Sequence, residues 1–175
     1  MTLLALSGAF FLLLMLLVRG HFTETKLSHM SWEELLAELQ PVQSAGINSA
    51  ALEYLQPVRP QIATEPSELW KMIGGAEGLG RMRSNADVLL ALAAYAQQWN
   101  FDESVIVAER MRRDSLALRR AARVVACTVF LGVGRSRGAF YMHEAASAYY
   151  LMARRLLALY EASPARRHPR LAAAL

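Results

Sequence analysis

The residues of this chain best suited to chemistry are arginines. Five of them lie opposite the apolar stripe of one predicted helix: Arg112, Arg113, Arg119, Arg120 and Arg123. Spacings of seven and four place the first, third and fifth on one side of that helix, with the other two at its flank. Five neighbouring cations predict contact with an anionic surface, and lipid headgroups are the nearest such surface for a tethered domain. The alternative is a solvated helix face that pairs with the protein's own acidic half.

Charge divides the chain into two unequal halves. Residues 19–100 carry 6 basic and 9 acidic side chains, whereas residues 101–175 carry 13 basic and 6 acidic ones, and the whole chain has a formal charge of +4. This asymmetry supports the anionic-surface hypothesis. Nucleic acid is not the expected partner, because no recognised fold and no aromatic–basic motif accompanies the arginines.

Two single residues of the same helix also carry predictions. Asp114 interrupts its apolar stripe and follows Arg110 by four residues, so we expect these two to form an ion pair with Asp114 at least half buried. Cys127, the only cysteine, lies in the apolar run VVACTVF. It cannot form an intramolecular disulfide and is predicted to be a small buried hydrophobe.

Catalytic and metal-binding patterns are scarce. None of the four histidines (His21, His29, His143 and His168) has a glutamate three positions before it, as di-iron bundles require, and no two are spaced for zinc. His143 is predicted to project from a polar helix face. No serine or cysteine nucleophile can be paired with a base. We therefore expect no metal, no cofactor and no catalytic residue.

Two glycine-rich segments invite comparison with phosphate-binding loops. GGAEGLGR, at residues 74–81, lacks the preceding strand and the Gly-Lys pair that such loops need. We interpret it as a helix stop followed by a flexible joint. GVGRSRG, at residues 132–138, is interpreted as a turn between helices.

The chain opens with an uncharged apolar run. From Thr2 to Val18 there is no charged side chain, and a helix of this length spans about 26 Å, the short end of what crosses a bilayer. Nothing basic precedes the run and no small-x-small cleavage site follows it, as a signal peptide would require. We predict a retained signal-anchor in the lipid bilayer through residues 2–18. A cleaved signal peptide and a buried core helix are the alternatives.

Flanking charge indicates the orientation of this anchor. Arg19 and Lys26 follow the run, and only Glu24 opposes them. The positive-inside rule then places the domain after the anchor in the cytoplasm of a single-pass cell-membrane protein.

The rest of the chain has the periodicity of helices and shows no strand or hairpin signal. Ser31 and Glu34 form a capping box, Pro66 suits a first helical turn, and Gly74 suits a helix end. The segment ADVLLALAAYAQQW is apolar almost all round and is predicted to be the central helix, with a second membrane-embedded segment as the alternative. The expected helices cover residues 31–40, 49–55, 66–73, 84–99, 102–131 and 139–162.

Apolar stripes assign the buried faces of the last two helices. The first buries Val107, Met111, Leu118, Ala122, Val125 and Val129. The second buries Met142, Ala145, Ala146, Tyr149, Met152, Ala153, Leu156 and Tyr160, and leaves His143, Ser147, Arg154 and Glu161 outside.

These patterns predict an all-α fold, with one N-terminal transmembrane helix followed by a small bundle of three longer and two or three shorter helices. The expected divisions are an anchor (1–20), a linker (21–30), a short-helix collar (31–83), a bundle core (84–162) and a tail (163–175). We expect a membrane-anchored scaffold, adaptor or accessory protein without catalytic activity, acting on an unknown protein partner or as a homo-oligomer. A tethered enzyme or ligand-binding protein with a pocket in the bundle is the alternative.

Overall fold

The computed structural model describes residues 26–56, 64–97, 101–131 and 135–162, and within these ranges the secondary structure is helical, without strands. The all-α prediction is therefore confirmed for this part of the chain. The helices are α2 (Trp32–Ala37), α3 (Ser44–Leu55), α4 (Pro66–Met72), α5 (Gly75–Ala96), α6 (Phe101–Leu131) and α7 (Arg135–Ala162).

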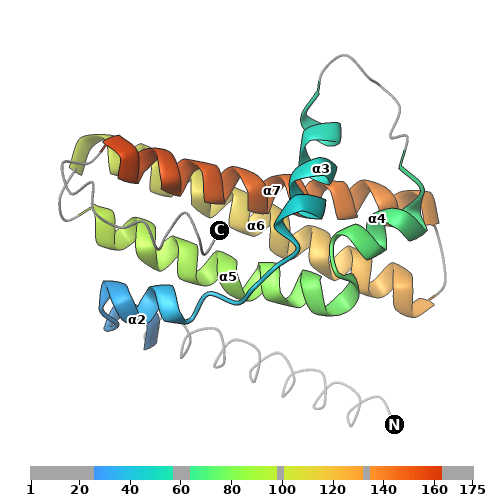
Figure 1. Ribbon diagram of the computed structural model, residues 1–175, viewed down its shortest axis with the longest axis horizontal. Coiled ribbons are helices and arrows are strands. Elements are labelled where there is room, and N and C mark those ends of the chain that lie inside the picture. Colours follow the sequence, from blue (N-terminus) through green and yellow to red (C-terminus); the bar gives the residue numbers. More distant parts are fainter. Residues whose placement is uncertain (1–25, 57–63, 98–100, 132–134, 163–175) are drawn as a thin grey trace, which may run out of the picture.

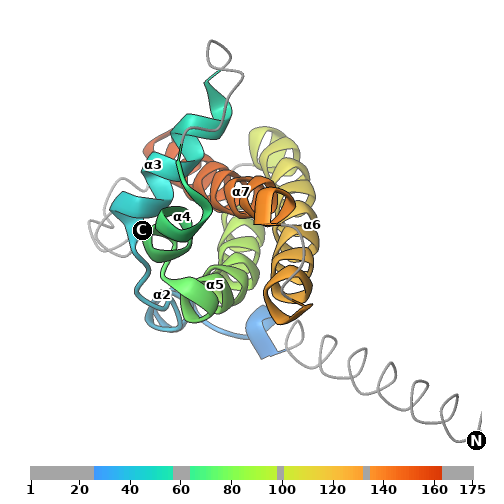
Figure 2. The same ribbon diagram turned by 90° about the vertical axis from the view of Figure 1, so that its right-hand side faces the viewer.

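Three long helices form the body of the molecule. Figure 1 shows α5, α6 and α7 lying along one another, with α6 running opposite to the other two. α3 crosses α7 near its middle and α4 packs at one end, while α2 lies against α5. In the end-on view of Figure 2, α7 lies between α6 on one side and α3 and α4 on the other.

The predicted helix-start and helix-stop signals act where they were expected. The Ser31 backbone N–H donates to the Glu34 carboxylate at 2.7 Å, and the Glu34 N–H donates to Ser31 Oγ at 3.4 Å, which completes the capping box of α2. Pro66 is the first residue of α4. Gly74 has the left-handed φ of +81° that favours glycine, and it separates α4 from α5.

The glycine-rich segment at residues 74–81 is helical beyond Gly75, so its interpretation as a flexible joint was wrong. α5 begins there, nine residues before the predicted start near Ser84. Gly74 and Gly75 both have a left-handed φ, which redirects the chain, and the following residues continue directly into a helix. In GVGRSRG, residues 135–138 already belong to α7, and 132–134 lie outside the described residues.

One hydrophobic core unites the short helices with the long ones. The short helices therefore belong to the same packed unit as α5, α6 and α7. The buried residues of this core come from every described helix and include Trp32, Ile47, Leu69, Leu89, Met111 and Met152.

α7, and not α5, is the central helix. α7 packs against α3, α4, α5 and α6, whereas one side of α5 remains partly exposed. All eight residues of α7 predicted to be buried are buried. The prediction was wrong for His143 and Ser147, which are 0% and 4% exposed, because α3 covers the face on which they lie.

The apolar stripe of α6 is largely as predicted. Met111, Leu118, Ala122 and Val125 are buried, but Val129 is 55% exposed near the end of the helix. Cys127 is also exposed, contrary to prediction. It follows Val125 by two residues, a rotation of about 200°, and so it points away from the core.

No helix within the described ranges is long and apolar enough to cross a bilayer, and this includes α5, the suggested second membrane segment. The predicted anchor at residues 2–18 lies outside the described residues.

Candidate functional site

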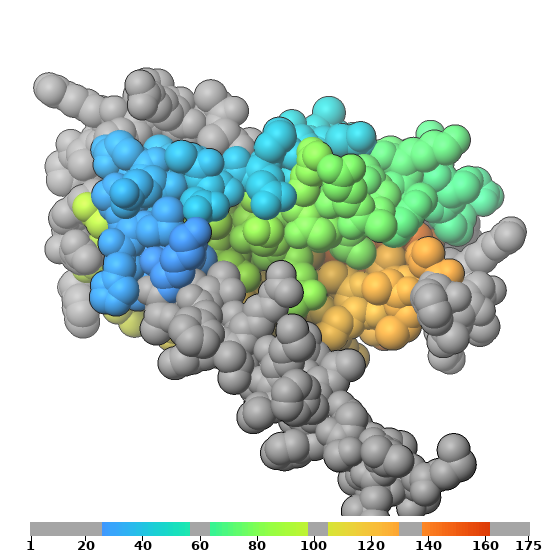
Figure 3. Space-filling model, turned by 90° about the horizontal axis from the view of Figure 1, so that it is seen from below, coloured from blue at the N-terminus to red at the C-terminus, as the bar shows by residue number. Residues whose placement is uncertain are grey.

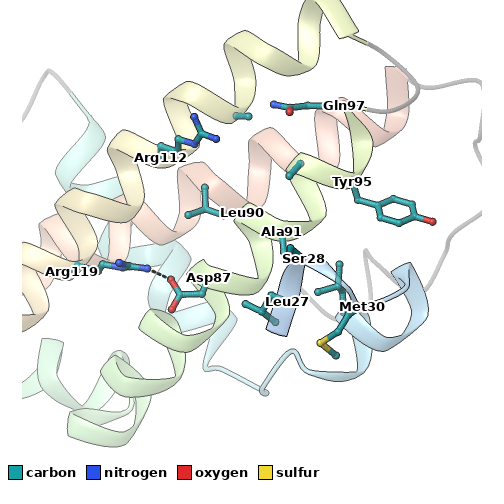
Figure 4. Close-up of a pocket in the computed structure, with 13 residues that line it drawn as sticks. Leu27, Ser28, Met30, Asp87, Leu90, Ala91, Tyr95, Gln97, Arg112 and Arg119 are labelled. Atoms are coloured by element: carbon teal, nitrogen blue, oxygen red, sulfur yellow. Dashed lines mark hydrogen bonds and ion pairs between the residues drawn. The ribbon is translucent and has the colours of Figure 1, made fainter. Parts of the chain in front are cut away.

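A groove of about 450 Å³ opens between α5, α6 and the segment that precedes α2. Figure 4 shows its walls: α5 forms one side, α6 the other, and Leu27, Ser28 and Met30 approach from the N-terminal segment. Figure 3 shows the N-terminal segment and α2, in blue, against the green surface of α5. A concavity of this volume is within the range of small-molecule sites.

The groove exists because α5 is apolar on more sides than its neighbours cover. Leu89 and Leu92 are fully buried in the core. Leu90, Ala91 and Ala94 face outward into the groove and keep part of their surface. The segment ADVLLALAAYAQQW was thus correctly seen to be apolar all round, but its outer side meets a groove instead of another helix.

An ion pair closes one end of the groove. Arg119 Nη2 of α6 donates to the Asp87 carboxylate of α5, and both side chains are about two-thirds or more buried, at 34% and 23% exposed. α5 begins twelve residues before Asp87, so Asp87 lies in the interior of the helix, and its carboxylate is held by Arg119.

Arg112 projects from α6 at the middle of the groove. Its nearest acidic partner is Glu109, at 3.8 Å, and the same carboxylate also pairs with Arg113 at 3.4 Å. One carboxylate is therefore shared by two guanidinium groups, which leaves this turn of α6 with a net positive charge.

The five predicted contact arginines fall into two groups. Arg112 and Arg119 line the groove, and Arg119 is neutralised by Asp87. Arg113, Arg120 and Arg123 lie exposed on α6 outside the groove lining. Arg123 Nε also donates to the Arg119 backbone carbonyl at 3.3 Å. Of the five predicted arginines, Arg119 is thus the one that is not fully exposed on α6.

The predicted pair between Arg110 and Asp114 requires correction. Asp114 forms its ion pair with Arg155 of α7, across the interface between the two helices, and is 18% exposed. Its predicted burial is therefore right and its predicted partner is wrong. Burial lowers the pKa of the Arg155 guanidinium, and the nearby charge of Arg110 lowers it further. Arg110 is thus a neighbouring positive charge that repels Arg155, and not the partner of Asp114.

His143 was missed as a structural residue. Its Nδ1 donates to the Ala50 carbonyl at 2.9 Å and its Nε2 lies 3.8 Å from a Glu53 carboxylate oxygen. That carboxylate accepts hydrogen bonds from the Thr64 hydroxyl at 2.6 Å and the Thr64 N–H at 3.0 Å. The histidine thus joins α3 to α7.

Aromatic rings pack beside the other end of the groove. Trp32 lies 4.4 Å from Tyr160 and 6.0 Å from Tyr95, between ring centroids. Burial raises the pKa of the Tyr160 hydroxyl, with a smaller contribution from Tyr95. Tyr95 and Gln97 complete the groove at this end.

Within the described ranges, no group of three or more histidine, cysteine, aspartate or glutamate side chains could hold a metal ion. Sequence reasoning found Arg112 and Arg119 but missed the apolar lining, which includes Leu27, Met30 and Leu90. The uniform hydrophobicity of α5 was the available signal. No family model, curated protein or solved structure matches this chain.

Proposed function

We propose that this chain is a single-pass membrane-anchored helical module that acts as a scaffold, adaptor or accessory protein. Residues 2–18 form the anchor, and the helical domain lies on the cytoplasmic side. Arg113, Arg120 and Arg123 of α6 contact anionic lipid headgroups. The uncharged run from Thr2 to Val18 supports the anchor, and the flanking Arg19 and Lys26 support the orientation.

The position of residues 27–30 is the observation that carries this proposal. Leu27, Ser28 and Met30 line the same groove as Arg112 and Arg119. Lys26 follows Val18 by only eight positions, a reach of at most about 28 Å. An anchored chain would therefore hold α6 close to the membrane surface.

The expected electrostatic gain is modest for each residue. A basic side chain near an anionic leaflet contributes about 1 kcal/mol, and the attraction falls away beyond a Debye length of roughly 8 Å at physiological salt. Because the domain is already tethered, three exposed arginines on α6 are enough to orient it against the bilayer.

Cys127 provides the reporter for a direct test, since it is exposed on α6 and is the only cysteine. The full chain is reconstituted in liposomes with a fluorophore on Cys127, and quenching by headgroup-labelled lipid is measured. We expect stronger quenching with anionic than with zwitterionic vesicles, and we expect high salt to abolish the difference. R113E/R120E/R123E should remove the difference as well.

R83E/R154E is the matched control, because both residues are exposed and lie on α5 and α7. This variant should keep the preference for anionic vesicles. Equal quenching by both lipid types, or no effect of the triple reversal on α6, would contradict the proposed contact. Recovery of the chain in an alkaline wash of the membranes would contradict the anchor.

The accessory role requires a partner protein or a second copy of the chain. Exposed apolar side chains on α6 support such a contact: Val105, Ile106 and Leu116 are 42%, 58% and 65% exposed. Affinity purification from solubilised membranes, followed by mass spectrometry, tests it. Recovery of the chain alone and monomeric would contradict an adaptor role.

A further inference from the structure

We propose that the groove between α5 and α6 binds one acyl chain that carries an anionic head group, either a carboxylate or a phosphate. This inference does not depend on the contact between α6 and the membrane surface. It rests on the size of the groove, the apolar side chains within it and the position of Arg112.

The size of the groove favours a thin occupant. It extends along α5 from Asp87 to Gln97, ten residues or about 15 Å. The groove has a volume of about 450 Å³. A groove of this length and volume can enclose an extended alkyl chain.

The lining of the groove is apolar where such a chain would lie. Leu27 and Met30 approach from the N-terminal segment, Leu90, Ala91 and Ala94 from α5, and Ala108 from α6. These side chains offer hydrophobic contact without a polar group that must be satisfied. The small alanines leave the space that a larger residue would occupy.

The charges at the rim select an anionic head group. Asp87 and Arg119 neutralise each other, so neither offers a free charge to a ligand. Arg112 shares the Glu109 carboxylate with Arg113, at the longer distance of 3.8 Å, and its side chain is 68% exposed. Its guanidinium can bind a carboxylate or phosphate through two parallel hydrogen bonds.

The test uses the full chain in zwitterionic nanodiscs and a photoreactive dodecanoic acid. We expect the acid to label peptides from α5 and from the segment around Leu27. Unlabelled dodecanoate and dodecyl phosphate should compete, whereas dodecyltrimethylammonium should not. A second arm of the experiment places the photoreactive chain on an anionic phospholipid. Comparison of labelling in the two arms shows whether the groove takes its acyl chain from a free acid or from a lipid of the bilayer. Labelling in either arm supports the proposal.

Substitutions localise the binding. Ala94→Trp places a large ring in the groove from an exposed position, and it should reduce labelling at least tenfold. Leu116→Trp is the matched control on the exposed side of α6 and should leave labelling unchanged. Arg112→Gln should weaken competition by dodecanoate about tenfold. R120E/R123E keeps Glu109 and both of its arginine partners, so it should leave groove labelling intact, which separates this test from that of the membrane contact.

Labelling outside the groove would overturn the proposal, as would labelling that Ala94→Trp does not reduce. Equal competition by the cationic amphiphile would overturn the assignment of an anionic head group. Cross-links between two copies of the chain through groove residues would show that a second copy occupies the site instead.

Discussion

Asn85 is a buried polar residue whose hydrogen bonds fix three parts of the molecule together. Its side-chain oxygen accepts from the Gln40 N–H at 2.9 Å, and its amide nitrogen donates to the Gln40 carbonyl at 2.8 Å and to the Tyr149 hydroxyl at 3.1 Å. The side chain thus pairs with the backbone after α2 as another peptide group would. Burial raises the pKa of the Tyr149 hydroxyl, and the hydrogen bond from Asn85 partly offsets this.

Asn85→Ala should destabilise the fold by about 2–4 kcal/mol, because it leaves both backbone groups of Gln40 without their partner. Urea unfolding monitored by circular dichroism measures the change. Asn48→Ala, at an exposed position of α3, is the control and should change stability by less than about 0.5 kcal/mol. Equal stabilities of the two variants would contradict the structural role of Asn85.

Substitutions at Asp114 and Arg110 distinguish the observed ion pair from the expected one. Asp114→Asn should destabilise by about 1–2 kcal/mol, since it removes the partner of the partly buried Arg155. Arg110→Gln should be neutral or slightly stabilising, because the charge of Arg110 opposes that of Arg155. Thermal unfolding of the two variants decides between the two ion pairs. Similar losses of stability in both variants would indicate that Arg110 is the partner of Asp114.

At this scale, sequence reasoning succeeded where partners are close along the chain. Ser31 and Glu34 are three residues apart, and their capping pattern has one geometric interpretation. Asn85 and Gln40 are separated by 45 residues, and His143 and Ala50 by 93. Nothing in the local pattern of a lone polar residue identifies a backbone partner so distant.

Among the elements, the junction of α3, α4 and α5 depends on close backbone approach. A Cβ at Gly46 of α3 would lie 2.1 Å from the Met72 carbonyl oxygen of α4. By contrast, a Cβ at Gly80 of α5 would have no neighbouring heavy atom within 4 Å. Two helical glycines therefore serve different purposes, and only the first is required by packing.

Gly46→Ala should destabilise by about 2 kcal/mol or more, because α3 must move away from α4. Gly80→Ala should stabilise by about 0.5–1 kcal/mol, since alanine suits a helix interior better than glycine. Chemical denaturation of both variants provides the comparison. No gain in Gly80→Ala would indicate that residues 75–81 are a joint, as the sequence suggests, and not the first turns of α5.

The sequence predicts which segments form the long helices better than it predicts which helices pack against them. Periodicity located α6 and α7 and most of their buried faces, because an apolar stripe indicates which side is covered. It does not indicate what covers it. α7 has a face with His143 and Ser147 that resembles a solvated surface, and only the position of α3 explains their burial. The groove was missed for the same reason, since an apolar side of α5 looks identical whether a helix or a cavity lies beside it.

For the whole molecule, the exposure of Cys127 makes the orientation measurable without mutation. In cells that express the chain, a membrane-impermeant maleimide should label Cys127 only after the cells are permeabilised, as expected for a cytoplasmic domain. Cys127→Ser should show no labelling under either condition. Labelling in intact cells would reverse the proposed topology.

The central position of α7 has a consequence for biosynthesis. α3, α4, α5 and α6 all pack against this helix, yet each is translated before it. At about 5–20 residues per second, roughly 6–24 s pass between the synthesis of Ser44 and that of Ala162. During this interval the nascent chain exposes apolar faces that have no partner, the condition in which chaperones are needed. A premature stop before Arg135 would therefore release four helices that have lost their common neighbour, and not a smaller version of the bundle.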